Sequence, residues 1–176
     1  MSLVASPGPD KIFTGNFVLL WIANFTNFGS FYLLLTTLPL YLVEVGLGES
    51  DIGLLIGVLS VTAVVFRPFT GRVADVWSRK WVAVAGGLII VISFVMYPLA
   101  TSMPLLLALH VFRGAGWGAF LAAAPALVAD IAPERRRGEM VGYYGTSTNV
   151  AMVISPYAGI VILKAFGFTA LFLSAA

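Results

Sequence analysis

The side chains with the greatest chemical potential in this sequence form a stripe inside an apolar segment. His110, Arg113 and Trp117 are spaced three and four residues apart, so a helix would carry all three on one side. An arginine there can bind an anionic group, and a histidine beside it can carry a proton or simply pack. The sequence shows no nucleophile–base pair and no metal-ligand spacing. The stripe therefore predicts binding and not enzyme catalysis, and we expect neither a cofactor nor a metal.

A second chemical feature is the decapeptide "GRVADVWSRK", residues 71–80. It concentrates Arg72, Asp75, Arg79 and Lys80 in a chain that is only 10% charged. Gly71 opens this run, and Asp130 closes a later apolar segment. Asp75, Arg79 and Asp130 can form an ion-paired cluster that opens and closes. The alternative is that these charges only orient the chain and stay solvated.

The composition indicates that these residues belong to a membrane protein. Hydrophobic residues make up 60% of the chain, and its charged fraction of 10% is less than half of the roughly 25% found in soluble domains. Too little polar surface remains to cover a water-soluble core, so the lipid bilayer is an expected partner. A net charge of +2 is too small to suggest nucleic acid, and the absence of cysteine excludes disulfides and thiolate metal sites.

Five apolar segments are long enough to cross a bilayer, which takes about 20 helical residues. They are predicted at 16–43, 50–71, 81–99, 104–129 and 139–163, with Ser50 and Asp51 expected to cap the second. Residues 1–15 are expected to form a cytoplasmic tail and 16–176 a partial transmembrane bundle. "FGF" at 166–168 predicts a turn, after which "FTALFLSAA" begins a sixth span and does not complete it. The chain reads as a fragment, or as a truncated form that needs partners.

The positions of lysine and arginine predict the orientation, because cytoplasmic loops are enriched in these residues. One side would hold Lys11, the basic residues of 72–80 and Arg135 to Arg137, and the other only Lys164. We therefore expect a multi-pass protein of a bacterial-type inner membrane, with a cytoplasmic N-terminus and a cytoplasmic loop at 71–80.

An internal sequence similarity links the second and fifth segments. An offset of 88 residues aligns Gly57 with Gly145, Pro68 with Pro156, and Gly71 with Gly159. An offset of three spans reverses orientation, so spans 1–3 and 4–6 would be inverted repeats, as in many secondary transporters. The alternative is coincidence, because proline and glycine are common in membrane helices.

Four stretches, taken in order, resemble the major facilitator superfamily. "GRVADVWSRK" resembles its loop motif through Gly71, Asp75, Arg79 and Lys80, whereas Val76 and Ser78 depart from it. "RGAGWGAF" at 113–120 resembles the fourth-helix arginine followed by glycines, and "ADIAPERRRGEMVGYYG" at 129–145 resembles the loop between helices 4 and 5. "ISPYAGIVIL" at 154–163 resembles the fifth-helix motif of exporters, with Ser155 in place of glycine. That replacement leaves export or uptake open.

The resemblance implies an all-α, N-terminal six-helix half of a twelve-helix carrier, built from 3+3 inverted repeats and cut inside helix 6. Such carriers perform secondary active transport of a small solute by alternating access, as antiporters or symporters. The missing half, or a second copy of the chain, would be the partner. Two alternatives remain: a fragment that does not transport, and a half-length carrier that works only as a homodimer. The resemblance also implies that the Asp75–Arg79–Asp130 cluster, with Gly71, forms a cytoplasmic gate or latch that holds the outward-facing state of the carrier.

Six residues are candidates to line the central cavity, where an anionic substrate would bind. Arg113 lies about 14 Å into its span, near the midplane, and no acidic residue of spans 1–5 lies at that depth. A charged residue there is costly unless it faces a cavity or a partner. For each asparagine an interhelical hydrogen bond is an equal alternative. Gly114 and Gly118 form a GxxxG pattern that favours close helix packing over the alternative of a homodimer motif. The six candidates are Asn24, Asn27, His110, Arg113, Trp117 and Asn149.

Overall fold

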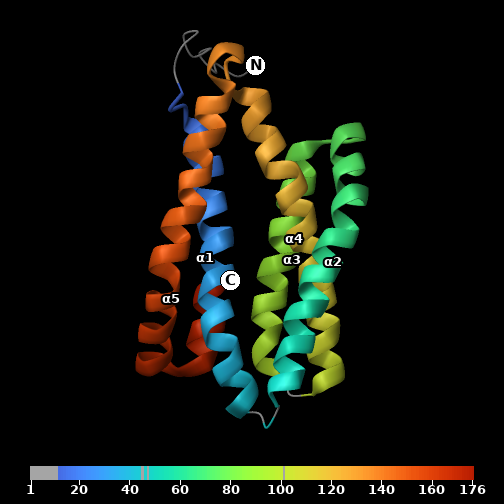
Figure 1. Ribbon diagram of the computed structural model, residues 1–176, viewed down its shortest axis with the longest axis vertical. Helices are drawn as coiled ribbons and strands as arrows, with labels where there is room; N and C mark the ends of the chain where they lie inside the picture. Colours follow the sequence, from blue (N-terminus) through green and yellow to red (C-terminus); the bar gives the residue numbers. More distant parts are fainter. Residues whose placement is uncertain (1–11, 45, 47, 101) are drawn as a thin grey trace.

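The computed structural model describes residues 12–44, 46, 48–100 and 102–176. Five long helices run along the molecule (Figure 1): α1 Gly15–Glu44, α2 Glu49–Val76, α3 Arg79–Met96, α4 Met103–Ile131 and α5 Arg137–Ala175. Short turns of 3-10 helix, η1 Tyr97–Leu99 and η2 Glu134–Arg136, follow α3 and precede α5. Each long helix is long and apolar enough to cross a membrane. The five predicted spans are confirmed. Most of the helix ends lie within a few residues of the predicted positions.

The end of α2 differs from the prediction. The helix continues to Val76 and α3 begins at Arg79, so "GRVADVWSRK" is two helix ends joined by Trp77 and Ser78, and the expected loop at 71–80 is wrong. No strong helix breaker follows Gly71, which allows α2 to run on. Ser78 starts α3 because its hydroxyl accepts a hydrogen bond from the Trp81 amide at 3.5 Å.

The beginning of α2 also differs by two residues from the expected cap. Gly48 is the N-cap, and Ser50 lies inside the helix. The Asp51 carboxylate accepts a hydrogen bond from the Gly48 amide at 3.0 Å. Asp51 therefore satisfies the free N–H group of the residue three positions before it. The acidic side chain helps to begin the helix, as predicted, but from within its first turn.

The helices pack in two groups. α1 pairs with α5, while α2 and α3 both pack along α4. Glycines of α4 permit this close approach: a Cβ at Gly118 would lie 2.6 Å from the Ala63 carbonyl oxygen, and a Cβ at Gly114 would lie 2.7 Å from the Leu59 carbonyl oxygen. The predicted packing role of this GxxxG pair is confirmed, and its partner is α2 of the same chain.

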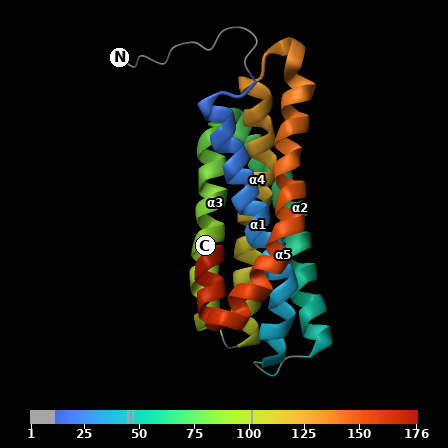
Figure 2. The same ribbon diagram turned by 90° about the vertical axis from the view of Figure 1, so that its left-hand side faces the viewer.

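The chain turns at Gly167, where φ is +79°, a backbone conformation that suits glycine. Residues after this turn run back alongside α1 and end between α1 and α3, as two perpendicular views show (Figures 1 and 2). The Ser30 hydroxyl donates a hydrogen bond to the Ala175 carbonyl. Phe172 is buried against Tyr41 and stacks on Tyr97 at a ring distance of 5.2 Å. The predicted turn at 166–168 and the start of a sixth helix are therefore present.

The two ends of the bundle differ in charge. The α2–α3 and α4–α5 connections lie at the upper end in Figure 1, together with the first described residues, and the other connections and the Gly167 turn lie at the lower end. The basic residues of 72–80 and Arg135 to Arg137 are thus at one end, and Lys164 is near the other. Lys11 and residues 1–11 of the predicted tail lie outside the described residues. The cytoplasmic assignment of the basic end stays a prediction.

Candidate functional site

Arg113 lies in the interior of the bundle. Only 2% of its surface is exposed, and its guanidinium carbon lies 4.6 Å from the centre of the Phe94 ring on α3. Among the described residues no carboxylate forms an ion pair with it, and its Nε has no hydrogen-bond partner. An arginine at the centre of a bilayer costs at least about 2.5–3.5 kcal/mol. The face of an aromatic ring offsets part of that cost when the cation is desolvated.

His110 lies one turn before Arg113 and is 1% exposed. Its Nδ1 lies 2.8 Å from the Leu106 carbonyl oxygen, and its Nε2 lies 3.2 Å from the Tyr97 hydroxyl. This arrangement suits a neutral ring that donates from Nδ1 to the carbonyl and accepts at Nε2 from the hydroxyl. The end of α3 and its following turn therefore contact both His110 and Arg113.

Trp117 completes the predicted stripe by packing on α1. Its ring stacks on Phe31 with 4.7 Å between centroids and meets the edge of Phe28 at 5.0 Å. The indole is 7% exposed. All three stripe residues therefore point into the bundle, toward α1 and α3, and their contact with a substrate stays a prediction.

A small cavity adjoins this stripe. It has a volume of ≈ 30 Å³, about the space of one water molecule. His110 and Arg113 form its α4 wall, and its other walls come from α1 and α2. Two of its lining residues, Leu35 and Ser60, are exposed, so the cavity lies next to the outer face between α1 and α2.

Asn24 forms interhelical hydrogen bonds, which is one of the two roles that the sequence allowed. Its amide nitrogen donates to the Ser147 hydroxyl at 2.7 Å and to the Thr148 hydroxyl at 2.9 Å, and its oxygen accepts from the Tyr144 hydroxyl at 2.7 Å. Asn24 is 1% exposed. Hydrogen bonds of this kind hold membrane helices together, and here they join α1 to α5.

The other two asparagines lie elsewhere. Asn27 is 9% exposed and faces a groove between α1 and α3, and its Oδ1 has no hydrogen-bond partner among the residues that the structure describes. Asn149 is exposed on α5. No hydrogen bond between any of the three asparagines and Arg113 is found within the described ranges. The six candidate lining residues therefore do not form one cluster in this chain.

The charged cluster at the basic end is formed as predicted. Arg79 Nη2 lies 2.7 Å from Asp75 Oδ1, and Arg79 Nη1 lies 2.6 Å from Asp130 Oδ1. One guanidinium thus joins the end of α2, the start of α3 and the end of α4. All three side chains remain accessible to solvent, with 33% of Arg79, 63% of Asp75 and 50% of Asp130 exposed. Contacts between exposed charges of this kind are weak and salt-sensitive.

Gly71 lies one turn before this cluster and faces α4. A Cβ there would lie 3.8 Å from the Cβ of Ala122, an ordinary contact distance. Space alone would therefore allow an alanine. Lys80 does not join the cluster: its Nζ lies 5.9 Å from the centroid of the Trp81 ring, and the residue lines the α1–α3 groove.

Comparison with known proteins decides the family. Residues 20–176, nearly the whole of the described chain, match the Major Facilitator Superfamily. The chain belongs to the major facilitator superfamily. This family comprises membrane transporters and not enzymes, so the sequence-based resemblance and the exclusion of enzyme chemistry are confirmed. An integral, multi-pass membrane protein follows from the family together with the five apolar helices.

Two bacterial relatives give the family match more detail. The chain is 27% identical over 141 residues to the quinolone resistance protein NorA of Staphylococcus aureus. The matched stretch covers 80% of this chain and 36% of NorA. It is 27% identical over 162 residues to the multi-drug resistance efflux pump PmrA of Streptococcus pneumoniae. This match covers 90% of this chain and 40% of PmrA. The chain thus spans well under half the length of these major facilitator relatives.

Sequence reasoning missed two sets of contacts made by the candidate residues. Phe94 and Tyr97, which contact Arg113 and His110, looked like ordinary apolar residues of a span. Tyr144 and Ser147, which bind Asn24, were not singled out either. Their spacing held a usable signal, because Tyr144, Ser147 and Thr148 occupy one side of a helix. No signal in the sequence pairs that side with Asn24.

Proposed function

We propose that this chain forms the N-terminal half of a secondary active transporter that exports a small solute by alternating access. The observation that carries the proposal is Arg113, a buried cation without an acidic partner in the described part of the chain, beside a cavity. An ionisable residue inside a membrane bundle supports, by default, the hypothesis of a functional site. An anionic group of the substrate would supply the missing charge.

Export is supported by the relatives. PmrA is named as an efflux pump and NorA as a quinolone resistance protein. Ser155, which departs from the exporter motif, is buried beside Gly29, and a Cβ at Gly29 would lie 3.2 Å from its hydroxyl oxygen. A small residue is therefore still needed where α1 crosses α5. The substitution keeps the close helix crossing that a glycine would allow.

The helix pairing supports the inverted-repeat architecture. If α1 corresponds to α4 and α2 to α5, then the α2–α4 packing has its counterpart in the α5–α1 packing. The aligned glycines behave in the same way: Gly71 faces Ala122 on α4, and Gly159 lies against Leu33 on α1. In this proposal the Asp75–Arg79–Asp130 cluster holds the cytoplasmic ends together in one state and breaks in the other.

Reconstitution into liposomes tests the proposal. The purified chain alone should show no saturable flux against a broad panel of solutes that includes a quinolone, because a carrier needs a second six-helix half around its central site. Joined to such a half, it should show saturable, gradient-driven export that the Arg113→Ala variant lacks. Saturable flux from the chain alone would instead favour the homodimeric carrier. No flux from either form would favour the non-transporting fragment.

A further inference from the structure

The cavity beside Arg113 has a wall that is mostly apolar. Ser60 of α2 and His110 and Arg113 of α4 are its polar lining residues. A pocket of this kind fixes its ligand through a small number of polar groups. The free hydrogen-bonding capacity of these three residues therefore decides what can bind. The other lining residues are Phe31, Leu34, Leu35 and Leu38 of α1 and Ile56 and Leu59 of α2.

Two of the three polar side chains already have partners. The Ser60 hydroxyl donates a hydrogen bond to the Ile56 carbonyl oxygen at 2.9 Å. The His110 ring lies between the Leu106 carbonyl oxygen at 2.8 Å and the Tyr97 hydroxyl at 3.2 Å. A neutral ring uses both of its nitrogens in these contacts. Neither side chain therefore has a hydrogen left to donate to a ligand.

Arg113 is different, because part of its hydrogen-bonding capacity is unused. Its Nε is buried without a hydrogen-bond partner in the described part of the chain. On the α3 side its guanidinium carbon lies 4.6 Å from the centre of the Phe94 ring, which supplies no negative charge. Arg113 is also the only charged side chain that lines the cavity. The wall thus offers one cation and no second side-chain donor.

A single cation in an apolar wall distinguishes anions by their charge. One negative charge pairs with the guanidinium, which can give a carboxylate two parallel N–H···O bonds. A second charge, or an additional oxygen atom, would face leucine, isoleucine and phenylalanine side chains without a partner. Burial of an unpaired charge or polar atom is costly. The wall therefore favours a group that carries one charge over a group that carries two.

We infer that this cavity selects the terminal group of an amphiphilic monoanion, such as a carboxylate on an apolar body, over dianionic and neutral groups. Resting on the proposed function, this selectivity names the class of solute whose anionic group Arg113 binds. At ≈ 30 Å³ the cavity takes only a small terminal group, so the body of the solute lies outside it. The rim there is apolar: Leu35 is 41% exposed, and Val64, one turn after Ser60, is 72% exposed.

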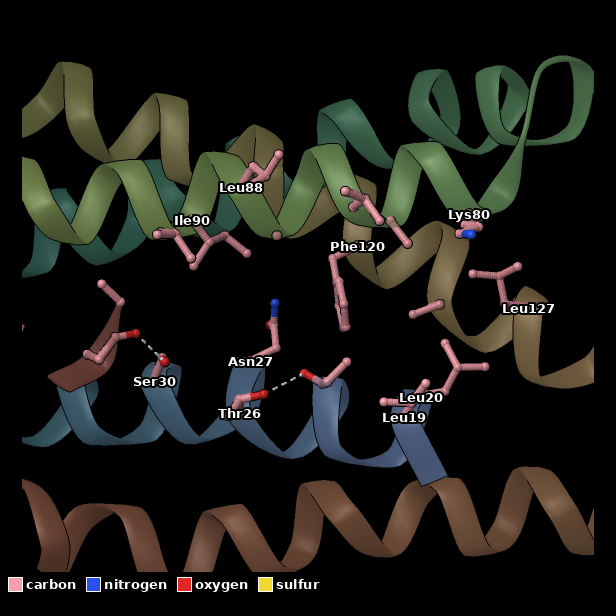
Figure 3. Close-up of a pocket in the computed structure, with 18 residues that line it drawn as sticks. Leu19, Leu20, Thr26, Asn27, Ser30, Lys80, Leu88, Ile90, Phe120 and Leu127 are labelled. Carbon is pink, nitrogen blue, oxygen red and sulfur yellow. Dashed lines mark hydrogen bonds between the residues drawn. The ribbon is translucent and has the colours of Figure 1, made fainter. Parts of the chain in front are cut away.

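A second place in this chain could hold an amphiphilic anion, and the test has to separate the two. The groove between α1 and α3 has a volume of ≈ 550 Å³, and Lys80 is the only charged side chain in its lining (Figure 3). Arg113 does not line this groove. Lys80 is exposed, so an anion would gain little from its solvated charge. Replacement of Lys80 therefore serves as a control.

Four ligands built on one benzene ring test the selectivity. Benzoate and benzenesulfonate carry one negative charge, phenylphosphonate carries two in mildly alkaline buffer, and benzamide carries none. Binding to the purified chain is measured in phosphatidylcholine nanodiscs. Trp117 reports it, because its ring stacks on the cavity-lining Phe31 with 4.7 Å between centroids. Replacement of the other three tryptophans by phenylalanine makes its fluorescence unique.

Benzoate should change this fluorescence saturably, with a half-saturation concentration roughly tenfold below that of phenylphosphonate, and benzamide should have no effect. Benzenesulfonate matches phenylphosphonate in shape and benzoate in charge, so it should bind within a few-fold of benzoate. Arg113→Gln should abolish the response. Arg113→Lys keeps the charge and should weaken the response several-fold. Ser60→Ala and Lys80→Gln should leave it unchanged, and melting curves check that each variant is folded.

Equal half-saturation concentrations for benzoate and phenylphosphonate, with both responses lost in Arg113→Gln, would refute the selectivity and keep Arg113 as an anion site. A benzoate response that survives Arg113→Gln and disappears with Lys80→Gln would place the anion in the α1–α3 groove instead. A weaker response of Ser60→Ala would show that its hydroxyl is a second donor. No saturable response to any ligand would also refute the inference, whereas transport by the complete carrier decides the proposed function.

Discussion

The guanidinium carbon of Arg113 lies 4.6 Å from the centre of the Phe94 ring, and both side chains are almost completely buried. An aromatic face thus stands where a carboxylate would be expected. A ring attracts a cation without neutralising it. The proposed function requires that Arg113 keep this charge available to an anionic group of the substrate.

Replacement of Arg113 should separate a binding role from a packing role. In the complete carrier we expect Arg113→Ala to abolish transport while expression and thermal stability stay near those of the parent. Arg113→Lys should raise the half-saturation concentration several-fold, because lysine lacks the planar fork of donors. Transport assays and melting curves on the same preparations provide the measurement. A lowered Tm for Arg113→Ala, with normal transport by the protein that survives, would show that Arg113 is structural.

The charged cluster should control access from the basic end. Asp75→Asn removes one of the two carboxylates that hold Arg79, and Asp130→Asn removes the other. In the complete carrier either change should increase the labelling of cysteines placed on the cytoplasmic side. Glu139→Gln is the matched control, because it breaks an exposed ion pair with Arg136 at the same end without touching the cluster. Equal labelling of all three variants and the parent would mean that the cluster only orients the helices.

The sequence predicted the helices well because bilayer thickness sets their length. It could not predict which helices pair. Lipid and the bundle interior are equally apolar, so the side of a helix that faces other helices is no more apolar than the side that faces lipid. α4 is apolar on every side, so only its glycines and its stripe of His110, Arg113 and Trp117 marked its inner faces. Asn24 and Asn27 show the same limit. The two residues are three positions apart on α1, yet one binds α5 and the other faces an open groove.

Asn24 should contribute to stability through its bonds to α5. Asn24→Ala loses the contacts to Tyr144, Ser147 and Thr148, and we expect a cost of about 1–2 kcal/mol, since hydrogen bonds between membrane helices average about 0.6 kcal/mol each. Tyr144→Phe, which removes one of those bonds, should cost less. Unfolding in mixed detergent micelles measures both. Asn149→Ala should have little effect, and a loss as large as that of Asn24→Ala would contradict the assignment.

The close packing of α2 against Gly114 and Gly118 of α4 can be tested by substitution. A Cβ at Gly118 would lie 2.6 Å from the backbone oxygen of Ala63, so α2 and α4 must move apart to accept it. Overpacking of this kind costs about 1–3 kcal/mol, and we expect Gly118→Ala to lower the free energy of unfolding by that amount. A Cβ at Gly145 on α5 would meet no atom within 4 Å, so Gly145→Ala should be neutral or slightly stabilising, because alanine favours a helix over glycine. Equal stability of the two variants would mean that α2 and α4 are not packed as closely as the structure shows.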